Sequence, residues 1–363
     1  MADVVHLHVG APKTGTTYLQ GRLHQNREAL ARHGIHYPSG LRQDMFVGAL
    51  DLIDRPWGGQ RSQVHGEWDA LTARARRVRG TAVISHEILA SATAEQAARA
   101  LTAFGDAEVH VVYSARDLGR QIPAEWQESV KHRSRRTFRA YTRLVRTRDQ
   151  VDSDLWFWRV HSLPDVLRRW GQHLPPERVH LITLPPSGSD REELWRRFCH
   201  ACGIDPTIGE PVGGRANVSL GIEEIAVLRD LNKRLKRSNL GGEAYGPLVR
   251  EHLAQQVLAQ RSDMRRAVLG PRHRDWARET ADGWIAHVRE SGIDVIGDLE
   301  DLRPVFPPAT ETWHDPDKPR PRVVREAAMT ALTGAVLEAA SRPDPASTPL
   351  ARMSRAVRRI RVR

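Results

Sequence analysis

The sequence predicts an α/β protein with a doubly wound parallel sheet flanked by helices and a helical C-terminal extension. Short apolar segments rich in β-branched residues alternate with amphipathic helical segments along the N-terminal half of the chain. The first of these apolar segments leads through a short glycine-containing loop into a helical segment. No apolar stretch is long enough to span a membrane, so a transmembrane segment is not expected.

Strands are expected from β-branched composition at residues 4–10, 82–85, 109–113 and 179–184. Helical spacing predicts the segments at about 16–26, 67–78, 94–104, 121–133, 164–173, 190–202, 221–238, 246–261 and 275–291. In doubly wound sheets, ligands bind at the carboxyl ends of the strands. We therefore expect residues 10–17, 85–87 and 114–116 to converge on one site.

The C-terminal part of the sequence differs in composition from the rest. A turn-rich stretch with many Pro and Asp residues runs from about 303 to 323, and an Ala-rich helical run follows at 324–340. These features predict one domain over residues 1–308. They also predict a linker, a helix and a basic, partly flexible tail over residues 309–363.

The charge balance favours anionic partners. Lys and Arg number 55 against 44 Asp and Glu, a formal net charge of +11. Part of the excess lies in the tail, at Arg352, Arg355, Arg358, Arg359, Arg361 and Arg363. Such a field attracts nucleotides, phosphates and anionic polymers alike. A protein that binds nucleic acid or another anionic polymer is thus one possible class, but no nucleic-acid motif supports specific nucleic-acid binding.

The cysteine content and the N-terminus predict a cytoplasmic location. The chain has two cysteines, Cys199 and Cys202, which excludes a disulfide framework. The N-terminal residues carry no basic segment or cleavage pattern of a signal peptide and are expected to begin a strand.

The loop between the first strand and the first helix has the features of a phosphate-binding loop. It reads Gly10-Ala-Pro-Lys-Thr-Gly-Thr-Thr17. Backbone N–H groups of such a loop and of the helix N-terminus bind an anion, and Lys13 adds a positive charge. In nucleotide triphosphatases a Lys directly follows the last Gly. Here Thr16 occupies that position, which argues against ATP hydrolysis with Mg²⁺.

The run Pro12-Lys-Thr-Gly-Thr-Thr17 resembles the 5′-phosphosulfate loop of sulfotransferases that use 3′-phosphoadenosine 5′-phosphosulfate (PAPS). The resemblance implies a P-loop-like, nucleotide-binding transferase with PAPS as co-substrate and no metal ion. It places the 5′-phosphate and the sulfuryl group on Pro12, Lys13, Thr14, Gly15, Thr16 and Thr17. It also implies that Lys13 contacts the oxygen between the leaving and transferred groups.

The acceptor that this resemblance implies is a hydroxyl or amine of a small molecule or a carbohydrate. The alternative enzyme class is another phosphate-loop transferase, such as a small-molecule kinase. No Lys follows Gly15 and no acidic strand end typical of Mg²⁺ binding is evident, and both observations disfavour the kinase.

Arg116, after the third long strand, matches the family's Arg that holds the 3′-phosphate of the cofactor. A guanidinium fork suits bidentate phosphate recognition. The family has a Ser eight residues later, where this chain has Ala124, and either Gln121 or Gln127 is a possible substitute. The alternative role for Arg116 is a salt bridge with Asp117 or a helix cap.

A later segment, residues 214–221, also resembles bacterial sulfotransferases, in which a late loop returns a basic residue to the 3′-phosphate. By this resemblance Arg215 is a cofactor-binding candidate, with Asn217 and Ser219 as weaker candidates. Ser219 is equally expected to be the N-cap of the helix that follows.

Two adjacent residues, His86 and Glu87, are candidates for the catalytic base at the end of the second strand. His86 matches the family members that act on aromatic alcohols, and Glu87 matches bacterial and carbohydrate enzymes. Because consecutive strand residues point in opposite directions, we expect only one of the two to face the cofactor.

Two groups of potential metal ligands are weak candidates. Cys199 and Cys202 form a C-x-x-C without a second pair of ligands, on a helix with apolar neighbours, so buried cysteines are expected. His6 and His8 share a strand face but have no evident carboxylate partners in the sequence.

Overall fold

The computed structural model describes residues 2–39, 44–54, 64–190, 192–211, 219–238, 240–308 and 310–342. The chain forms two compact units. The sheet unit comprises residues 1–129, 136–217 and 267–317, and the helical unit comprises residues 130–135, 218–266 and 318–363. The division between residues 1–308 and 309–363 that the composition suggests stays a prediction.

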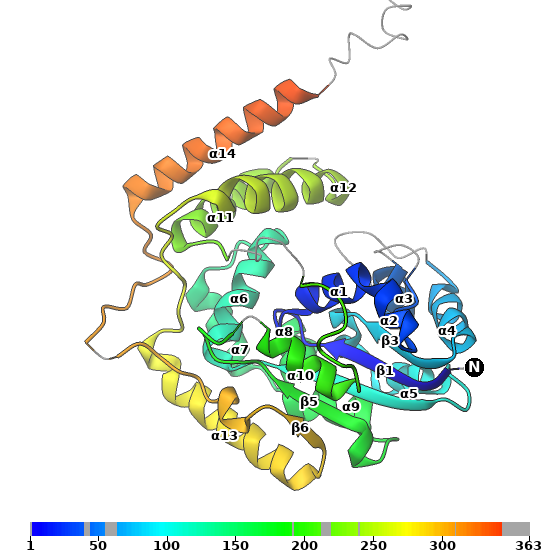
Figure 1. The fold of residues 1–363 in the computed structure, drawn as a ribbon. Helices are drawn as coiled ribbons and strands as arrows, with labels where there is room; N and C mark the ends of the chain where they lie inside the picture. Colours follow the sequence, from blue (N-terminus) through cyan, green and yellow to red (C-terminus); the bar gives the residue numbers. More distant parts are fainter. Residues whose placement is uncertain are drawn as a thin grey trace, which may run out of the picture. The chain divides into compact units, whose positions relative to one another are not determined.

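The sheet unit is built on a six-stranded, all-parallel sheet in the order β2-β3-β1-β4-β5-β6 (Figure 1). The strands are β1 (Ala2–Gly10), β2 (Ile35–His36), β3 (Gly80–Ser85), β4 (Glu108–Ala115), β5 (Val179–Thr183) and β6 (Asp294–Ile296). From β1 the chain passes to β2 and β3 on one side and then to β4 on the other. The carboxyl end of β1 is thus the switch point where such sheets bind ligands.

Helices cover both faces of the sheet, so its strands are buried on both sides. On one face, Phe198 of α10 (Glu193–Ala201) packs edge-on against His8 of β1, with ring centroids 5.2 Å apart. On the other face, α9 (Leu163–Gly171) lies against β5, where a Cβ at Gly171 would be 3.2 Å from Val179. The predicted α/β class with a parallel, helix-flanked sheet is confirmed.

The remaining helices of the sheet unit connect or flank the strands. They are α1 (Thr16–Gln25), α2 (Arg27–Arg32), α3 (Asp44–Ile53), α4 (Glu67–Arg77), α5 (Ala94–Thr102), α6 (Leu118–Lys131), α7 (Phe138–Thr147), α8 (Trp156–His161) and α13 (Arg274–Ser291). The last residues of α6 belong to the helical unit.

Several elements were not expected from the sequence. Strands β2 and β6 have only two and three residues, too short to show an alternating pattern. Helix α8 reads Trp-Phe-Trp-Arg-Val-His, and five of its six residues are buried, so it has no polar face to reveal its period.

The helical unit contains α11 (Ile222–Leu235), α12 (Gly242–Tyr245), a π-helical segment (Gly246–Val257) and α14 (Pro321–Ser341). Buried Glu223 and Glu224 of α11 form ion pairs with arginines at 265, 320 and 261. Among the described residues, no helix combines the length and apolarity that a membrane span requires.

Candidate functional site

The phosphate loop follows β1 directly and ends in α1, as the sequence predicts. Two glycines shape it, Gly10 with φ 111° and Gly15 with φ 84°, in the left-handed region where other residues are strained. A Cβ at Gly10 would lie 2.9 Å from the Glu87 Cα, and one at Gly15 would collide with the Leu194 side chain. Glycine therefore lets the loop close against the residues that follow β3.

Several backbone donors of this loop are free. In the part of the chain that the structure describes, the N–H groups of Lys13, Gly15, Thr16 and Thr17 have no hydrogen-bond acceptor. The first N–H groups of any helix lack intrahelical partners, but Lys13 and Gly15 lie before the helix. The Thr14 hydroxyl donates to the Ala11 carbonyl at 2.6 Å and closes the turn. The loop thus presents adjacent N–H donors without acceptors.

Lys13 contributes the positive charge of the loop. Its φ of 62° is unusual for a residue other than glycine. Its ammonium group forms an ion pair with Glu128 of α6, and the two side chains are 32% and 21% exposed. Both groups are therefore accessible to a ligand, and an anion at the loop would compete with Glu128 for Lys13.

Arg116 follows β4 and lies beside the loop. Its Nη1 donates to the Lys13 carbonyl at 3.2 Å, and its buried Nε has no partner within the described residues. Burial and the charge of Arg120 lower its pKa to about 10, which Asp117 offsets in part. Asp117 forms its ion pair with Arg120, so the alternative of an Arg116–Asp117 salt bridge is wrong. Arg116 is a half-buried cation whose buried Nε has unused hydrogen-bonding capacity among the described residues.

One face of α6 carries two side chains, seven residues apart, that contact the loop. Gln121 donates to the Pro12 carbonyl at 3.0 Å, and its buried Oε1 has no partner in the described chain. Glu128 pairs with Lys13, and Ala124 lies between these two positions on the same face. Of the two glutamines that were candidates to substitute for the missing serine, Gln121 therefore has a direct contact with the loop.

A hydrogen-bonded row links the carboxyl ends of β3, β1 and β4. His8 is fully buried, with Nδ1 2.8 Å from the Ser85 hydroxyl and Nε2 3.1 Å from the Ser114 hydroxyl. Burial lowers the pKa of His8 to about 4, so the ring is neutral. The Ala11 N–H donates to the Ser114 carbonyl at 2.9 Å. The three segments expected to converge at residues 10–17, 85–87 and 114–116 do so.

Glu87 is tied to the start of α1. Gln20 donates to its Oε2 at 3.1 Å, and the Thr16 hydroxyl also donates to this carboxylate. Burial raises the pKa of Glu87, but the adjacent His86 imidazole, in its protonated form, and hydrogen bonds from a backbone N–H, Gln20 and Thr16 outweigh burial and leave the pKa lowered. Glu87 is therefore ionised at neutral pH.

His86 takes a different orientation. Its Nδ1 accepts the Ile88 N–H at 3.3 Å and caps the short 3₁₀ helix Glu87–Ser91. Burial lowers the pKa of His86, and Glu87 only partly opposes this, so the ring is neutral. Strand β3 ends at Ser85, so strand alternation does not apply to His86 and Glu87, and the expectation that only one of them faces the cofactor stays a prediction.

A cavity of about 140 Å³ opens beside these residues. It is lined by Thr17, Gln20, His24, Tyr37, Met45 and His86. Thr17, Gln20 and His24 lie on one face of α1, at spacings of three and four residues. The buried Nδ1 of His24 has no partner among the residues described. The cavity thus adjoins the phosphate loop and offers polar groups to a second ligand.

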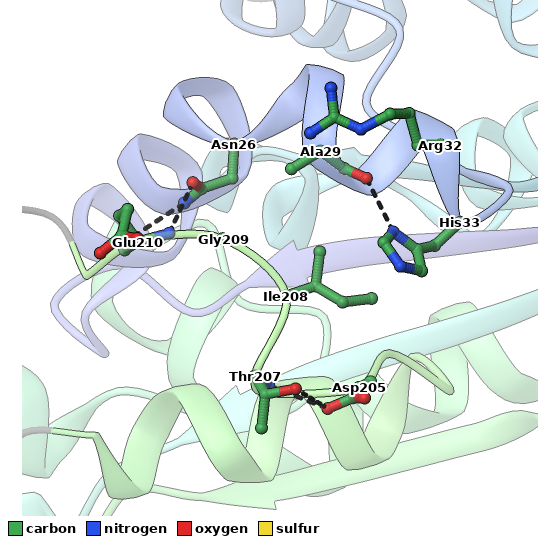
Figure 2. Close-up of a pocket in the computed structure, with 9 residues that line it drawn as sticks. All are labelled: Asn26, Ala29, Arg32, His33, Asp205, Thr207, Ile208, Gly209 and Glu210. Carbon is green, nitrogen blue, oxygen red and sulfur yellow. Dashed lines mark hydrogen bonds between the residues drawn. The ribbon is translucent and has the colours of Figure 1, made fainter.

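A larger hollow of about 480 Å³ lies elsewhere (Figure 2). It includes no residue of the phosphate loop, and its polar groups largely bond to one another. Asn26 exchanges two hydrogen bonds of 2.9 Å with the backbone of Glu210, and His33 bonds to the Ala29 carbonyl. This hollow therefore carries no candidate site.

The late loop of the predicted cofactor site is only partly described. Arg215 and Asn217 lie outside the described residues, and Ser219 is exposed. Helix α11 begins at Ile222 with Gly221 as its N-cap, so the prediction that Ser219 caps this helix is wrong. Cys199 and Cys202 are buried and unpaired, and burial raises the pKa of Cys199 to about 12.

Sequence reasoning missed several residues of this site. Gln20, His24 and Glu128 reach it only through the packing of α1 and α6 around the loop. Their helical spacing from Thr17 and Gln121 is the one signal in the sequence that places them on the same faces.

The chain matches no protein-family model, no curated protein and no solved structure.

Proposed function

We propose that the protein is a PAPS-dependent sulfotransferase with a P-loop-like nucleotide site at residues 10–17. One observation carries the proposal: at the switch point of the sheet lie Lys13, the buried Nε of Arg116 and loop N–H groups that have no acceptor among the described residues. Unpaired buried donors are rare in folded proteins, and a phosphate or sulfate group satisfies several of them at once.

The loop is assigned to the 5′-phosphosulfate. Thr16 and Thr17 begin α1, so their N–H groups face an anion held at the helix N-terminus. When the acceptor attacks sulfur, the bond from sulfur to the bridging oxygen breaks and negative charge develops on that oxygen. Lys13 leaves its ion pair with Glu128, contacts the ligand and neutralises this charge.

Arg116 is assigned to the 3′-phosphate, which distinguishes this nucleotide from ADP and ATP. Its hydrogen bond to the Lys13 carbonyl fixes one end of the guanidinium beside the loop and leaves Nε free. Gln121 is assigned a supporting role because it holds the Pro12 carbonyl from α6.

Glu87 is assigned as the base that takes the acceptor proton. His86 accepts the Ile88 N–H at Nδ1, so its single ring proton sits on Nε2, and that nitrogen donates a hydrogen bond instead of accepting a proton. Glu87 is an ionised carboxylate next to the loop, and its bond to Gln20 links it to the wall of the 140 Å³ cavity. The acceptor hydroxyl or amine is assigned to this cavity.

Labelled PAPS tests the activity. The chain is incubated with ³⁵S-PAPS and a panel of sugar, phenol and amine acceptors, and both labelled product and 3′,5′-diphosphoadenosine are measured. The proposal expects equal amounts of the two products without Mg²⁺. Transfer of phosphate from ATP with Mg²⁺, and none of sulfate from PAPS, would identify a kinase instead.

Paired variants test the base. Glu87→Gln should abolish turnover and spare 3′,5′-diphosphoadenosine binding, whereas His86→Gln should retain most of the turnover. The opposite result would assign the base to His86. Near-normal turnover in both variants would make His24 the next candidate base, because it lines the same cavity and its buried Nδ1 has no partner among the residues described.

A further inference from the structure

Three adjacent strands place histidines together on one face of the sheet, away from the phosphate loop. His6 of β1 pairs in register with His110 of β4, and His180 of β5 pairs with Val112, two residues further along β4. One ring nitrogen from each histidine lies within 4.8 Å of the others. His6 precedes His8 by two residues, so this histidine cluster lies about 7 Å further from the carboxyl end of β1 than the His8 row.

Two of these histidines are oriented by carboxylates. Nε2 of His110 lies 2.8 Å from Glu108 Oε1, and Nδ1 of His180 lies 2.7 Å from Asp294 Oδ2. A carboxylate accepts hydrogen bonds, so the ring proton of each histidine sits on the nitrogen that faces its carboxylate. A neutral imidazole carries one such proton, which leaves its other nitrogen with a lone pair.

These two lone pairs face each other. His110 Nδ1 and His180 Nε2 are 2.8 Å apart, and the rings are nearly parallel, with an interplanar angle of 13°. Two lone pairs at this distance repel unless a cation lies between or beside them. A histidine whose far nitrogen donates to a carboxylate is also the usual arrangement of a metal-ligating histidine.

The third histidine has an unused nitrogen. His6 is 6% exposed, and its buried Nδ1 has no partner among the described residues. An imidazole nitrogen without a hydrogen-bond partner is available to bind a metal.

We propose that His6, His110 and His180 form a binding site for a divalent transition metal of the zinc type. Imidazole nitrogens are preferred ligands of Zn²⁺, and three histidines leave a fourth coordination position open. The His110 side chain is 16% exposed, so the site has access to solvent. Glu108 and Asp294 fix the orientation of two ligands from the second shell.

Metal binding to the tag-free chain tests this proposal. Equilibrium dialysis against Zn²⁺ with metal analysis should give one ion per chain, and Co²⁺ should give a visible spectrum without thiolate charge-transfer bands. Asp294→Asn changes an exposed carboxylate and leaves the fold intact, and it should weaken Zn²⁺ binding by about 10–100-fold. His180→Gln removes a ligand and should abolish binding at the site.

His287→Gln is the matched control, because His287 is an exposed histidine on α13. It should bind Zn²⁺ like the wild type. The proposal is overturned if the wild type binds no metal. The short contact between His110 Nδ1 and His180 Nε2 would then be explained by a proton that the two nitrogens share. The proposal is also overturned if Asp294→Asn and His180→Gln bind Zn²⁺ as tightly as His287→Gln, or if the Co²⁺ spectrum shows thiolate ligation.

Discussion

Two histidines on the same face of β1 have opposite surroundings. His8 is fully buried and both ring nitrogens have a hydroxyl partner, Ser85 on one side and Ser114 on the other. His6, two residues earlier, is also buried, but its Nδ1 has no partner in the described part of the chain and the ring lies beside two other imidazoles. A histidine thus has both ring nitrogens hydrogen-bonded at one position, and at the other it has a ring nitrogen that can ligate a metal ion.

Residues beside the phosphate loop also differ in whether their polar groups have partners. Asp117 and Arg120 satisfy each other at the start of α6, so they support the structure. Within the residues that the structure describes, the adjacent Arg116 has a buried Nε without a partner, and it lies beside loop N–H groups without acceptors. A buried polar group with all partners made is part of the scaffold, and one without partners marks a place where a ligand completes the structure.

The largest effect on activity is expected at Lys13, which is assigned to the ligand. Lys13→Ala should lower sulfuryl turnover by roughly 10²–10³-fold, because a fixed cation at the bridging oxygen is lost. Turnover is measured with labelled PAPS, with circular dichroism as the check on folding. Lys233→Ala, an exposed lysine of α11, is the matched control and should be fully active. A folded Lys13→Ala protein with unchanged turnover would contradict the assignment.

Arg116→Ala should weaken binding of 3′,5′-diphosphoadenosine by about 1.5–3 kcal/mol, as expected for a charged hydrogen-bonding group. Binding of 5′-AMP, which lacks the 3′-phosphate, should weaken much less. Calorimetric titrations with both nucleotides measure the difference, and Arg99→Ala, an exposed arginine of α5, serves as the control. An equal loss for the two nucleotides would mean that Arg116 only supports the loop through the Lys13 carbonyl.

Lowering the pH should destabilise the folded protein, because the buried His8 resists protonation. Its folded pKa of about 4 lies below the unfolded value of 6.5, so the unfolded chain binds the proton first as pH falls. The contribution is complete above pH 6.5 and is lost as pH decreases toward 4, with a loss of roughly 2 kcal/mol at pH 5.

Urea unfolding at pH 7 and pH 5, with a chelator present, measures this loss. His8→Gln should be less stable than the wild type at pH 7 and should lose less stability between the two pH values. His6, with a folded pKa of about 3, contributes a loss of the same sign in both proteins. Parallel losses in the wild type and His8→Gln would show that His8 is not neutral in the folded state.

The smallest effect on nucleotide binding is expected from Glu128, the ion-pair partner of Lys13. Glu128→Gln removes the carboxylate that pairs with Lys13, and a partly exposed pair contributes only about 0.2–1 kcal/mol. Binding of 3′,5′-diphosphoadenosine should therefore tighten by a few-fold at most. Weaker binding in Glu128→Gln would indicate that Glu128 positions Lys13 for the ligand instead of competing with it.

The sequence predicted the sheet and the loop because both depend on local patterns. The buried strands β1, β3, β4 and β5 appear as β-branched runs, and the Gly10–Gly15 spacing marks the turn into α1. The convergence of the loop with residues 85–87 and 114–116 follows from the parallel topology alone.

Side-chain pairing was not predictable, because it depends on residues far apart in the chain. Glu128 meets Lys13 and Asp294 meets His180 across more than one hundred positions. The sequence showed His6 without a carboxylate partner, and its cluster becomes visible only when β1, β4 and β5 lie side by side. A histidine inside each of these three strands was the signal that sequence analysis left unused.

Calorimetric titration of the wild type with 3′,5′-diphosphoadenosine and with ADP, both in the presence of a chelator, measures whether the site prefers a nucleotide with a 3′-phosphate. Each ligand carries two phosphates, but only the first presents one of them at the 3′ position, where Arg116 is assigned. A sulfotransferase site should bind 3′,5′-diphosphoadenosine at least tenfold more tightly than ADP, in line with a charged hydrogen bond from Arg116 to the 3′-phosphate. Tighter binding of ADP, or binding of either nucleotide only with Mg²⁺, would contradict this expectation.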